Sequence, residues 1–248
     1  ALNDGDGPVG QDLADEITAR MPDFINIDLD AELYGLAMYR AKNYCKQKGD
    51  DLTFKGSAMT SSMFEPFGRE FIETGFRLML NGEIQALHDL YVDTVDRIVD
   101  RDIPVEDLAK RETLSESVDE YMAKIDDPDH GRTRDARYEL AISEDGVDDV
   151  VGEQVVYYNA GDLTSSPVYE NAKLIADYDN DENVKYYVRK RMQAFAKKFR
   201  PFFTPDDADR MFPRPERGEV RVERRDVSGV GLVQRIVEEP DEMDVKDL

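Results

Sequence analysis

The spacing of apolar residues changes between residues 56 and 65, and this change limits the folds that the chain can adopt. Before it, apolar and polar residues alternate, as in FINIDLDAEL at 24–33, which is typical of a strand with one buried face. A second extended stretch is expected at 33–47, followed by a hairpin turn at Lys48-Gly49-Asp50-Asp51. From Glu65 onward, apolar residues recur every three or four positions, as in a helix. The pattern therefore predicts an α+β fold, in which a short antiparallel sheet is followed by a mostly helical part.

The helical part is expected to contain several helices and a small strand pair. The periods predict helices at 11–21, 65–80, 83–100, 105–111, 113–125, 132–142, 167–178 and 182–199, and a strand at 150–158. Asn81-Gly82 is expected to end the second helix, and Pro201 and Pro205 to end the last. From residue 213 the chain has no period and is expected to form a mostly disordered or loosely docked tail. We therefore divide the chain into 1–56, 57–212 and 213–248.

The residue counts exclude several kinds of site. The single cysteine, Cys45, cannot form an internal disulfide, and two distant histidines, His88 and His130, are too few for a Cys/His zinc site. The Gly-x-Ser-x-Gly sequence of serine hydrolases is absent. The sequence has no apolar run of about 18 residues and no secretory signal at its start, so we expect a cytoplasmic protein without a membrane partner.

The charge is strongly acidic, with 55 acidic and 32 basic residues and a net charge of −23. Such a charge opposes binding to nucleic acid at low salt, because phosphate is repelled. The acidic residues are spread along the chain among ordered apolar periods, which favours adaptation to molar salt instead. The Debye length at 1 M salt is about 3 Å, so local basic clusters then say more about partners than the net charge does.

One basic cluster lies in the extended stretch. Arg40, Lys42, Tyr44 and Lys46 alternate along the sequence, so on a single strand they would share one face. Cations and an aromatic ring on one face suit a sugar–phosphate backbone. The alternative is a solvated strand face whose tyrosine covers the edge of the core.

These residues also resemble a known motif. Arg40-Ala41-Lys42-Asn43-Tyr44 is similar to the Lys-Lys-x-Tyr strand of family B DNA polymerases, and Lys55-Gly56-Ser57-Ala58 resembles the Lys-Gly turn that leads from the palm to the thumb in that family. In the family, this strand follows the palm aspartates and holds the primer–template duplex from its minor-groove side. Ala41 stands where the family usually has a second lysine, so either DNA is bound more weakly here or Arg40 substitutes for that lysine. Residues 60–62 likewise lack the arginine that follows the turn in the family.

Four further segments resemble the thumb of a divergent archaeal and bacterial branch of the family, in the same order. They are Glu65-Pro66-Phe67 with Arg69-Glu70-Phe71, Leu108-Ala109-Lys110 with Glu112-Thr113-Leu114 and Tyr121, Val151 to Val155 with Tyr157-Tyr158, and Tyr186-Tyr187. The resemblance covers roughly residues 24–200. It implies that 1–56 is the end of a palm and that 57–212 is a thumb. Together with the acidic composition, it leads us to expect a halophilic, archaeal source.

The resemblance implies a DNA-binding role within a DNA-directed DNA polymerase, which is a nucleotidyltransferase. The residues expected to contact primer–template DNA are Arg40, Lys42, Asn43, Tyr44, Lys46, Lys55, Gly56, Ser57, Lys110, Thr113 and Tyr121. The catalytic aspartates and their Mg²⁺ are expected outside this chain, in the remaining palm, with fingers and exonuclease-like domains as further partners. No catalytic or metal-binding residue is expected within the chain itself.

Other candidates favour structural roles. Asp28 and Asp30 resemble a catalytic Asp-x-Asp pair, but we interpret them as a solvated strand face. Cys45 is expected to pack in the core and His88 to lie at the surface. The tail segment 231–237 resembles a clamp-binding peptide only loosely. The densest basic run has two open interpretations, a phosphate-contacting face or cations that favour a helix dipole, and contains Lys185, Arg189, Lys190, Arg191, Lys197, Lys198 and Arg200.

Two alternatives to the polymerase hypothesis remain open from the sequence. The chain could be an inactive accessory or split subunit that binds DNA, or a helical protein–protein interaction module without a DNA role. In the second case, changes at Lys42 and Tyr44 would have no effect on DNA binding.

Overall fold

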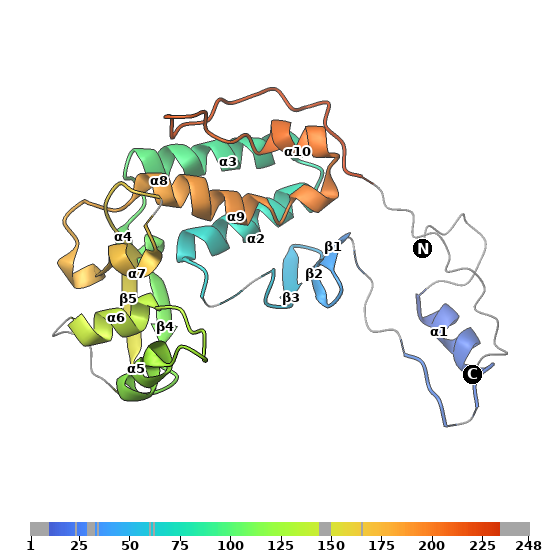
Figure 1. Ribbon diagram of the computed structural model, residues 1–248. Helices are drawn as coiled ribbons and strands as arrows, with labels where there is room; N and C mark the ends of the chain where they lie inside the picture. The colour runs from blue at the N-terminus through green and yellow to red at the C-terminus, as the bar shows by residue number, and fades with distance from the viewer. Residues whose placement is uncertain are drawn as a thin grey trace.

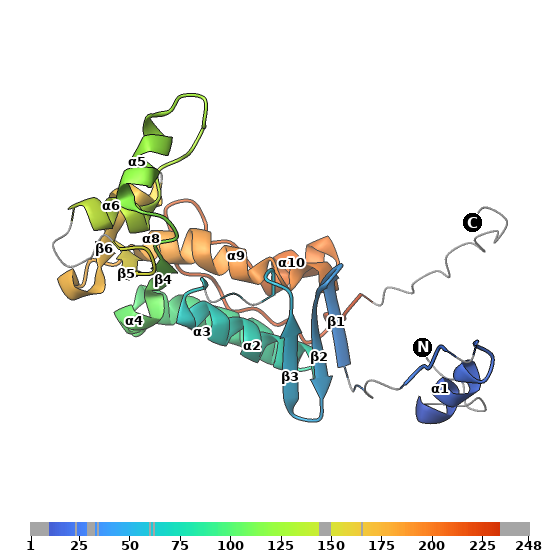
Figure 2. The same cartoon turned by 90° about the horizontal axis from the view of Figure 1, so that it is seen from below.

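The computed structural model describes residues 10–22, 24–28, 33, 35–59, 61, 63–143, 150–164 and 166–233. A helical layer is formed by α2 (Pro66–Leu80), α3 (Ile84–Val99), α8 (Val184–Tyr186), α9 (Gln193–Ala196) and α10 (Pro205–Met211), and two small sheets lie near its opposite ends (Figure 1). Figure 2 shows the same separation of the sheets and places α1 (Gly10–Thr18) apart from both of them. The α+β class predicted from the change of period is confirmed.

The first sheet contains β1 (Gly35–Arg40), β2 (Asn43–Lys48) and β3 (Asp51–Lys55), which are antiparallel and adjacent in chain order. The predicted turn at residues 48–51 is confirmed, since Lys48 pairs with Asp51. The single extended stretch predicted at 33–47 is wrong, because the chain reverses at residues 41–42 and Arg40 pairs with Asn43. The strand predicted at 24–33 is absent over residues 24–28 and at residue 33, and residues 29–32 lie outside the described part.

The inner face of this sheet packs on the C-terminal half of α2. Ala37 and Cys45 are buried there, and the Phe54 ring meets that of Phe76 edge-on with centroids 5.7 Å apart. Cys45 is fully buried, which confirms its expected packing role, and burial raises the pKa of its thiol to about 12. The amide of Gln47 donates to Asn81 at the end of α2, at 3.0 Å.

Two helices predicted from the period are confirmed. Helix α2 (Pro66–Leu80) begins with a proline in its first turn, where a missing N–H costs nothing, and ends before Asn81-Gly82. Helix α3 (Ile84–Val99) follows after a short turn.

The predicted last helix is formed by α8 (Val184–Tyr186), the π-helical segment η2 (Tyr187–Met192) and α9 (Gln193–Ala196). It approaches α2 closely at Gly68 and Gly75, seven residues apart, where a Cβ atom would overlap the rings of Phe195 and Phe199. The chain continues through η3 (Arg200–Phe202) to α10 (Pro205–Met211). Pro205 therefore starts a further helix, with Thr204 as its N-cap.

The second sheet belongs to a smaller unit that carries its own core. Its strands β4 (Lys110–Thr113), β5 (Gln154–Asn159) and β6 (Ala172–Leu174) are antiparallel, so the expected strand pair has a third member. Around it lie α4 (Val105–Leu108), α5 (Val118–Asp126), α6 (Ala136–Ser143), α7 (Val168–Asn171) and η1 (Ile175–Asp177). The helix predicted at 113–125 begins only at Val118, because Ser117 and Glu120 form a capping box and Thr113 ends a strand.

The chain after α10 is packed over residues 213–233, which corrects the prediction of a disordered or loosely docked tail for this part. Arg221 pairs with Asp96 and Asp100 of α3, and Arg224 pairs with Asp89 and Asp93. Val227 and Val230 are buried. Residues 234–237 of the loosely clamp-like segment lie outside the described residues, so that comparison stays untested.

His88 is fully buried, and the prediction of a surface position is wrong. Its Nε2 accepts from the backbone N–H of Arg225, at 2.8 Å, and its Nδ1 lies 2.8 Å from the carbonyl oxygen of Met211. The sequence offered no signal for this, because the partners are backbone groups more than 100 residues away. Within the described residues, no helix is both long and apolar enough to cross a membrane.

Candidate nucleic-acid interface

The outer face of the first sheet carries part of the predicted basic cluster. Tyr44 lies opposite Lys55 on β3 and opposite Met38 on β1, and Lys46 lies opposite Thr53. Directly paired residues of antiparallel strands share a face, so Tyr44, Lys46 and Lys55 point to the same side. The expected alternation therefore holds for Tyr44 and Lys46, and Lys55 joins them from the neighbouring strand.

Arg40 and Lys42 do not lie on the same strand as Tyr44, contrary to the prediction. Arg40 ends β1, with its guanidinium 4.9 Å from the centroid of the Tyr39 ring. Lys42 lies in the turn, exposed, with a φ of 61°. A non-glycine residue in this left-handed region costs roughly 1–2 kcal/mol. The turn therefore carries a strained lysine at a position that glycine would occupy with less strain.

Asn43 and Gly56 hold this turn against the loop that leads to α2. The Asn43 side chain donates to the carbonyl oxygen of Ala41 at 3.0 Å and accepts from the N–H of Ala58 at 2.9 Å. Gly56 has a φ of 86°, and a Cβ atom there would overlap Asn43 and the carbonyl oxygen of Lys42. These two predicted site residues thus position the turn, while Ser57 is exposed beside them.

Lys198 reaches the same loop from the last helix, and the residue was not among the site residues predicted from the sequence. Its ammonium donates to the carbonyl oxygen of Ala58 and lies 4.7 Å from the centroid of the Phe64 ring. Burial lowers the pKa of Lys198, as do the nearby charges of Arg40 and Arg191. No carboxylate pairs with it among the described residues. Only its place in the densest basic run of the sequence pointed to it.

Arg191 of the same run serves the fold. Its guanidinium binds both oxygens of Glu65, which is only 1% exposed, with Nε 2.6 Å from Oε1. Bidentate pairing of this kind fixes geometry as well as charge. It ties the start of α2 to the last helix beside Lys198.

Lys110 and Thr113 lie in the second unit, at the other end of the helical layer from the first sheet (Figure 1). Lys110 faces Tyr157 on the inner side of the sheet, with Nζ 3.9 Å from Glu112, and is half-buried. Thr113 points to the outer side, where it is exposed, and its carbonyl oxygen accepts from Arg137 at 2.6 Å. The two residues therefore share no surface.

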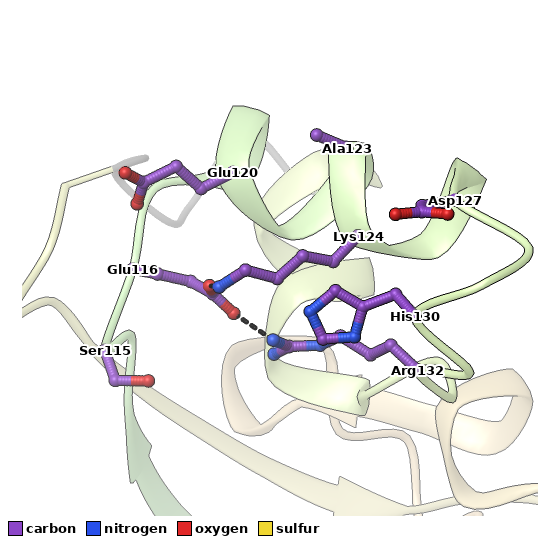
Figure 3. A pocket seen from close by; sticks show the side chains of 8 residues that line it. All are labelled: Ser115, Glu116, Glu120, Ala123, Lys124, Asp127, His130 and Arg132. Carbon is purple, nitrogen blue, oxygen red and sulfur yellow. Dashed lines mark hydrogen bonds and ion pairs between the residues drawn. The ribbon is translucent and has the colours of Figure 1, made fainter.

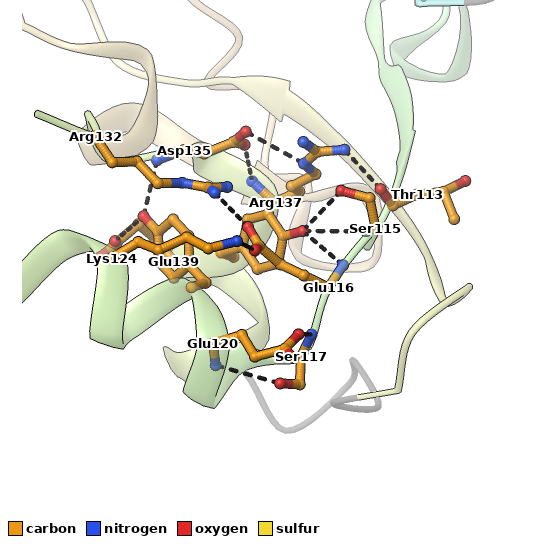
Figure 4. Close-up of polar contacts among 12 residues, drawn as sticks. Thr113, Ser115, Glu116, Ser117, Glu120, Lys124, Arg132, Asp135, Arg137 and Glu139 are labelled. Carbon is orange, nitrogen blue, oxygen red and sulfur yellow. Dashed lines mark hydrogen bonds and ion pairs between the residues drawn. The ribbon is translucent and has the colours of Figure 1, made fainter. Parts of the chain in front are cut away.

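Tyr121 is in the core of this second unit, a position that does not favour its predicted contact with DNA. The side chain is fully buried, and its ring stacks on Tyr138 with centroids 4.3 Å apart. Its hydroxyl donates to Glu139 at 2.7 Å and accepts from the N–H of Asp135 at 2.9 Å. Burial and the Glu139 hydrogen bond raise its pKa to about 12. Figure 4 shows the polar network around this core, including Arg137 between Thr113 and Asp135.

A polar hollow of about 710 Å³ opens beside this network, lined by Ser115, Glu116, Glu120, Lys124, His130 and Arg132 among others (Figure 3). Glu116 sits between Lys124 and Arg132 and pairs with both. The Lys124 hydrogen bond is the main cause that lowers the pKa of Glu116. Because the cations are already paired, the hollow has little charge left to attract an anion.

Metal ligation is not supported anywhere in the described part of the chain. No group of three or more histidine, cysteine, aspartate or glutamate side chains is placed there to hold a metal ion. Asp28 is exposed and outside any strand, and its partner in the sequence motif, Asp30, lies outside the described residues.

The fold is similar to part of a DNA polymerase. No protein-family model matches the sequence, and no curated protein matches it. Among solved structures, the family B DNA polymerase from the hyperthermophilic archaeon Pyrobaculum calidifontis matches with a TM-score of 0.59 and 18% identity. The match covers 76% of this chain and 24% of that polymerase, so the chain spans about a quarter of the polymerase that it resembles. At this identity the likeness shows a polymerase-like fold.

Proposed function

We propose that this chain is the palm end and thumb of a family B DNA polymerase and holds the primer–template duplex behind the active site. The observation that carries this proposal is the outer face of the first sheet, where Tyr44 and Lys55 lie side by side next to the exposed cation of Lys42. This face occurs in a fold similar to that of a family B DNA polymerase. The polymerase motifs in the sequence supply the expectation that DNA binds there.

The chemistry of this face suits a sugar–phosphate backbone. Arg40, Lys42 and Lys55 have no carboxylate partner among the described residues, although the chain carries 55 acidic side chains. Lysine and arginine bind phosphate without reading sequence, and a tyrosine packs on a sugar or base edge. Binding would therefore be independent of the DNA sequence, as a polymerase requires.

The strained turn supports a role for the Lys42 cation. A lysine with positive φ is an outlier that glycine or asparagine would relieve. Such strain at an exposed lysine is a reason to suspect function. We propose Arg40, Lys42, Tyr44, Lys46, Lys55 and Ser57 as DNA contacts, with Asn43 and Gly56 positioning them.

The second unit would contribute fewer contacts to DNA than the first sheet. Thr113 and Arg111 are exposed on the outer side of its sheet and remain candidates for a contact further along the duplex. Lys110 is turned toward Glu112, which reduces the charge that it can offer.

The remaining polymerase domains would be partners of this chain. Leu36 and Met38, on the edge strand β1, are 51% and 59% exposed, which fits a contact with the rest of the palm beside the DNA-binding face. The catalytic aspartates and their Mg²⁺ would lie in that part, and fingers and exonuclease-like domains beyond it. Adaptation to molar salt, inferred from the net charge of −23, belongs to the same proposal.

Fluorescence anisotropy of a labelled primer–template in molar KCl tests the proposal. We expect saturable binding that Tyr44→Ala/Lys55→Ala weakens by about tenfold or more, since losing one stacked aromatic costs about 1–3 kcal/mol. Tyr169→Ala/Lys173→Ala, a tyrosine–lysine pair in the second unit, is the matched control and should leave binding unchanged. Equal binding by both folded variants would contradict the proposal and favour a protein-interaction module.

A further inference from the structure

A basic groove separate from the first sheet lies between the last helix and the chain that follows α10. It encloses about 300 Å³ and is lined by four cations, Arg189, Lys190, Lys197 and Arg214, over a floor that includes Gln193 and Ala194. No acidic side chain lines it. Three of the four cations belong to the densest basic run of the sequence, whose role the function proposed above leaves unassigned.

The cations of this groove are not neutralised within the chain. None of the four pairs with a carboxylate in the part of the chain that the structure describes. Elsewhere on the surface, arginines such as Arg221 and Arg224 each pair with two aspartates. In a chain of net charge −23, a hollow whose charged side chains are all cations is a local reversal of the surface charge.

The groove is also held in shape by contacts beneath it. The Arg189 guanidinium donates to the carbonyl oxygens of Glu216 and Glu219, which fixes the segment after α10 against the helix. Gln193 donates to the hydroxyl of Tyr91 at 2.6 Å, below the floor. Lys190, Lys197 and Arg214 remain exposed above these contacts. A preformed site of this kind loses less conformational entropy when a ligand binds.

We propose that this groove binds the phosphates of a nucleic-acid strand, as a second contact beyond the first sheet. The proposal rests on the proposed function, because it takes the polyanion to be the DNA on which the chain acts. A protein partner is disfavoured, since protein interfaces depend on buried aromatic or large aliphatic anchors and the groove lining offers none. Lys190 and Lys197 are seven residues apart, roughly 10 Å along the helix, so they would contact different phosphates.

The salt dependence of DNA binding tests this proposal. Each phosphate contact contributes about 0.9 to the slope of log K against log salt concentration on duplex DNA. We expect Lys190→Gln/Lys197→Gln/Arg214→Gln to reduce the slope by about 2 to 3, measured by anisotropy over a KCl range in which circular dichroism shows a folded chain. Arg20→Gln/Arg97→Gln/Lys173→Gln, which removes the same charge elsewhere, should change the slope by less than about 1.

The outcomes separate the groove from the proposed function. An unchanged slope in the groove variant, while Tyr44→Ala/Lys55→Ala still weakens binding, would overturn the groove and leave the function standing. An equal loss of slope in the groove variant and its control would also overturn it, because net charge alone would then explain the effect. If neither the groove nor the sheet variant changes DNA binding, both proposals fail.

Discussion

The two sheets of this protein have the same topology and opposite uses of tyrosine. Each has three antiparallel strands, arranged in chain order. On the first sheet Tyr44 lies on the outer face, and its hydroxyl has no hydrogen-bond partner within the described residues. In the second unit Tyr121 and Tyr157 are buried, and each donates to a carboxylate, at 2.7 Å in both cases. Among the residues that the structure describes, the hydroxyl of Tyr44 is therefore unpaired on the first sheet, while the second unit uses the hydroxyls of Tyr121 and Tyr157 within its own core.

The difference shows that a tyrosine near lysines in sequence does not by itself mark a binding surface. Both Tyr44 and Tyr121 were predicted to contact DNA. They differ in what covers each ring, since Tyr44 lies on the outer face of the first sheet and the Tyr121 ring stacks on Tyr138 of α6. Substitution of Tyr44 should therefore affect DNA binding, while substitution of the buried tyrosines in the second unit should affect the stability of the fold.

The largest effect on stability is expected at Gly56, which fixes the first sheet to the loop before α2. Gly56→Ala should lower the free energy of unfolding by about 3 kcal/mol, because the new Cβ overlaps backbone and side chain at a positive φ. Gly49→Ala is the control, since Gly49 has a φ of 59° with nothing nearby, and should cost only about 1 kcal/mol. Urea unfolding measures both. Equal losses would mean that the Asn43–Gly56 contact does not position the turn.

The second unit should respond strongly to loss of one hydroxyl. Tyr157→Phe leaves the carboxylate of Glu112, which is 8% exposed, without its donor and should cost about 2 kcal/mol. Tyr44→Phe removes the same atom from the first sheet and should leave the free energy of unfolding unchanged. Thermal unfolding of the two variants compares the sheets directly. An equal loss of stability in the Tyr44→Phe and Tyr157→Phe variants would contradict the difference between the two tyrosine hydroxyls.

A smaller, pH-dependent effect is expected at Tyr121. Tyr121→Phe should cost about 1–2 kcal/mol at pH 8 through lost hydrogen bonds. The folded pKa of Tyr121 is raised to about 12, above about 10 in the unfolded chain, so the neutral phenol stabilises the fold fully below pH 10 and loses this effect as the pH rises toward 12. The difference between wild type and variant should therefore shrink between pH 10 and pH 12 in urea titrations. A constant difference would contradict the burial of this hydroxyl.

The smallest effect on stability is expected at Lys42. Lys42→Gly relieves the strain of the positive φ, which stabilises the folded state, but glycine also raises the conformational entropy of the unfolded chain. Because these two effects oppose each other, the free energy of unfolding should change by less than about 1 kcal/mol. Binding to primer–template should nevertheless weaken by about threefold to tenfold, through the loss of one phosphate contact. Lys48→Gly, on a regular strand, should instead destabilise the sheet by roughly 0.5–1 kcal/mol. A Lys42→Gly variant that binds DNA like the wild type would remove Lys42 from the interface.

The helical layer was predictable because its signals are local. The three- to four-residue period, Pro66 and Asn81-Gly82 define α2, and α3 follows the same pattern. The first sheet was less predictable, since the reversal at residues 41–42 uses Ala-Lys, a pair without the usual turn residues. The packing of residues 213–233 depends on pairs such as Arg221 with Asp96, 125 residues apart, which no local pattern reveals.

The candidate site was predictable where strand alternation determines it. Tyr44 and Lys46 share a face because they are two residues apart, and Lys55 joins them only through the register of β3. Lys198 was not predicted, because its contact with Ala58 spans 140 residues. The burial of Tyr121 was not predicted, since its helix begins five residues later than expected and its ring turns toward Tyr138.

Site-specific photocrosslinking tests most directly which sheet holds DNA. A benzoylphenylalanine probe would replace Tyr44 in one folded variant and Thr113 in another, each mixed with labelled primer–template in molar KCl. We expect crosslinks to the duplex from position 44, with a clearly lower yield from position 113. Crosslinks from position 113 with none from position 44 would contradict the assignment of the first sheet as the DNA-holding surface.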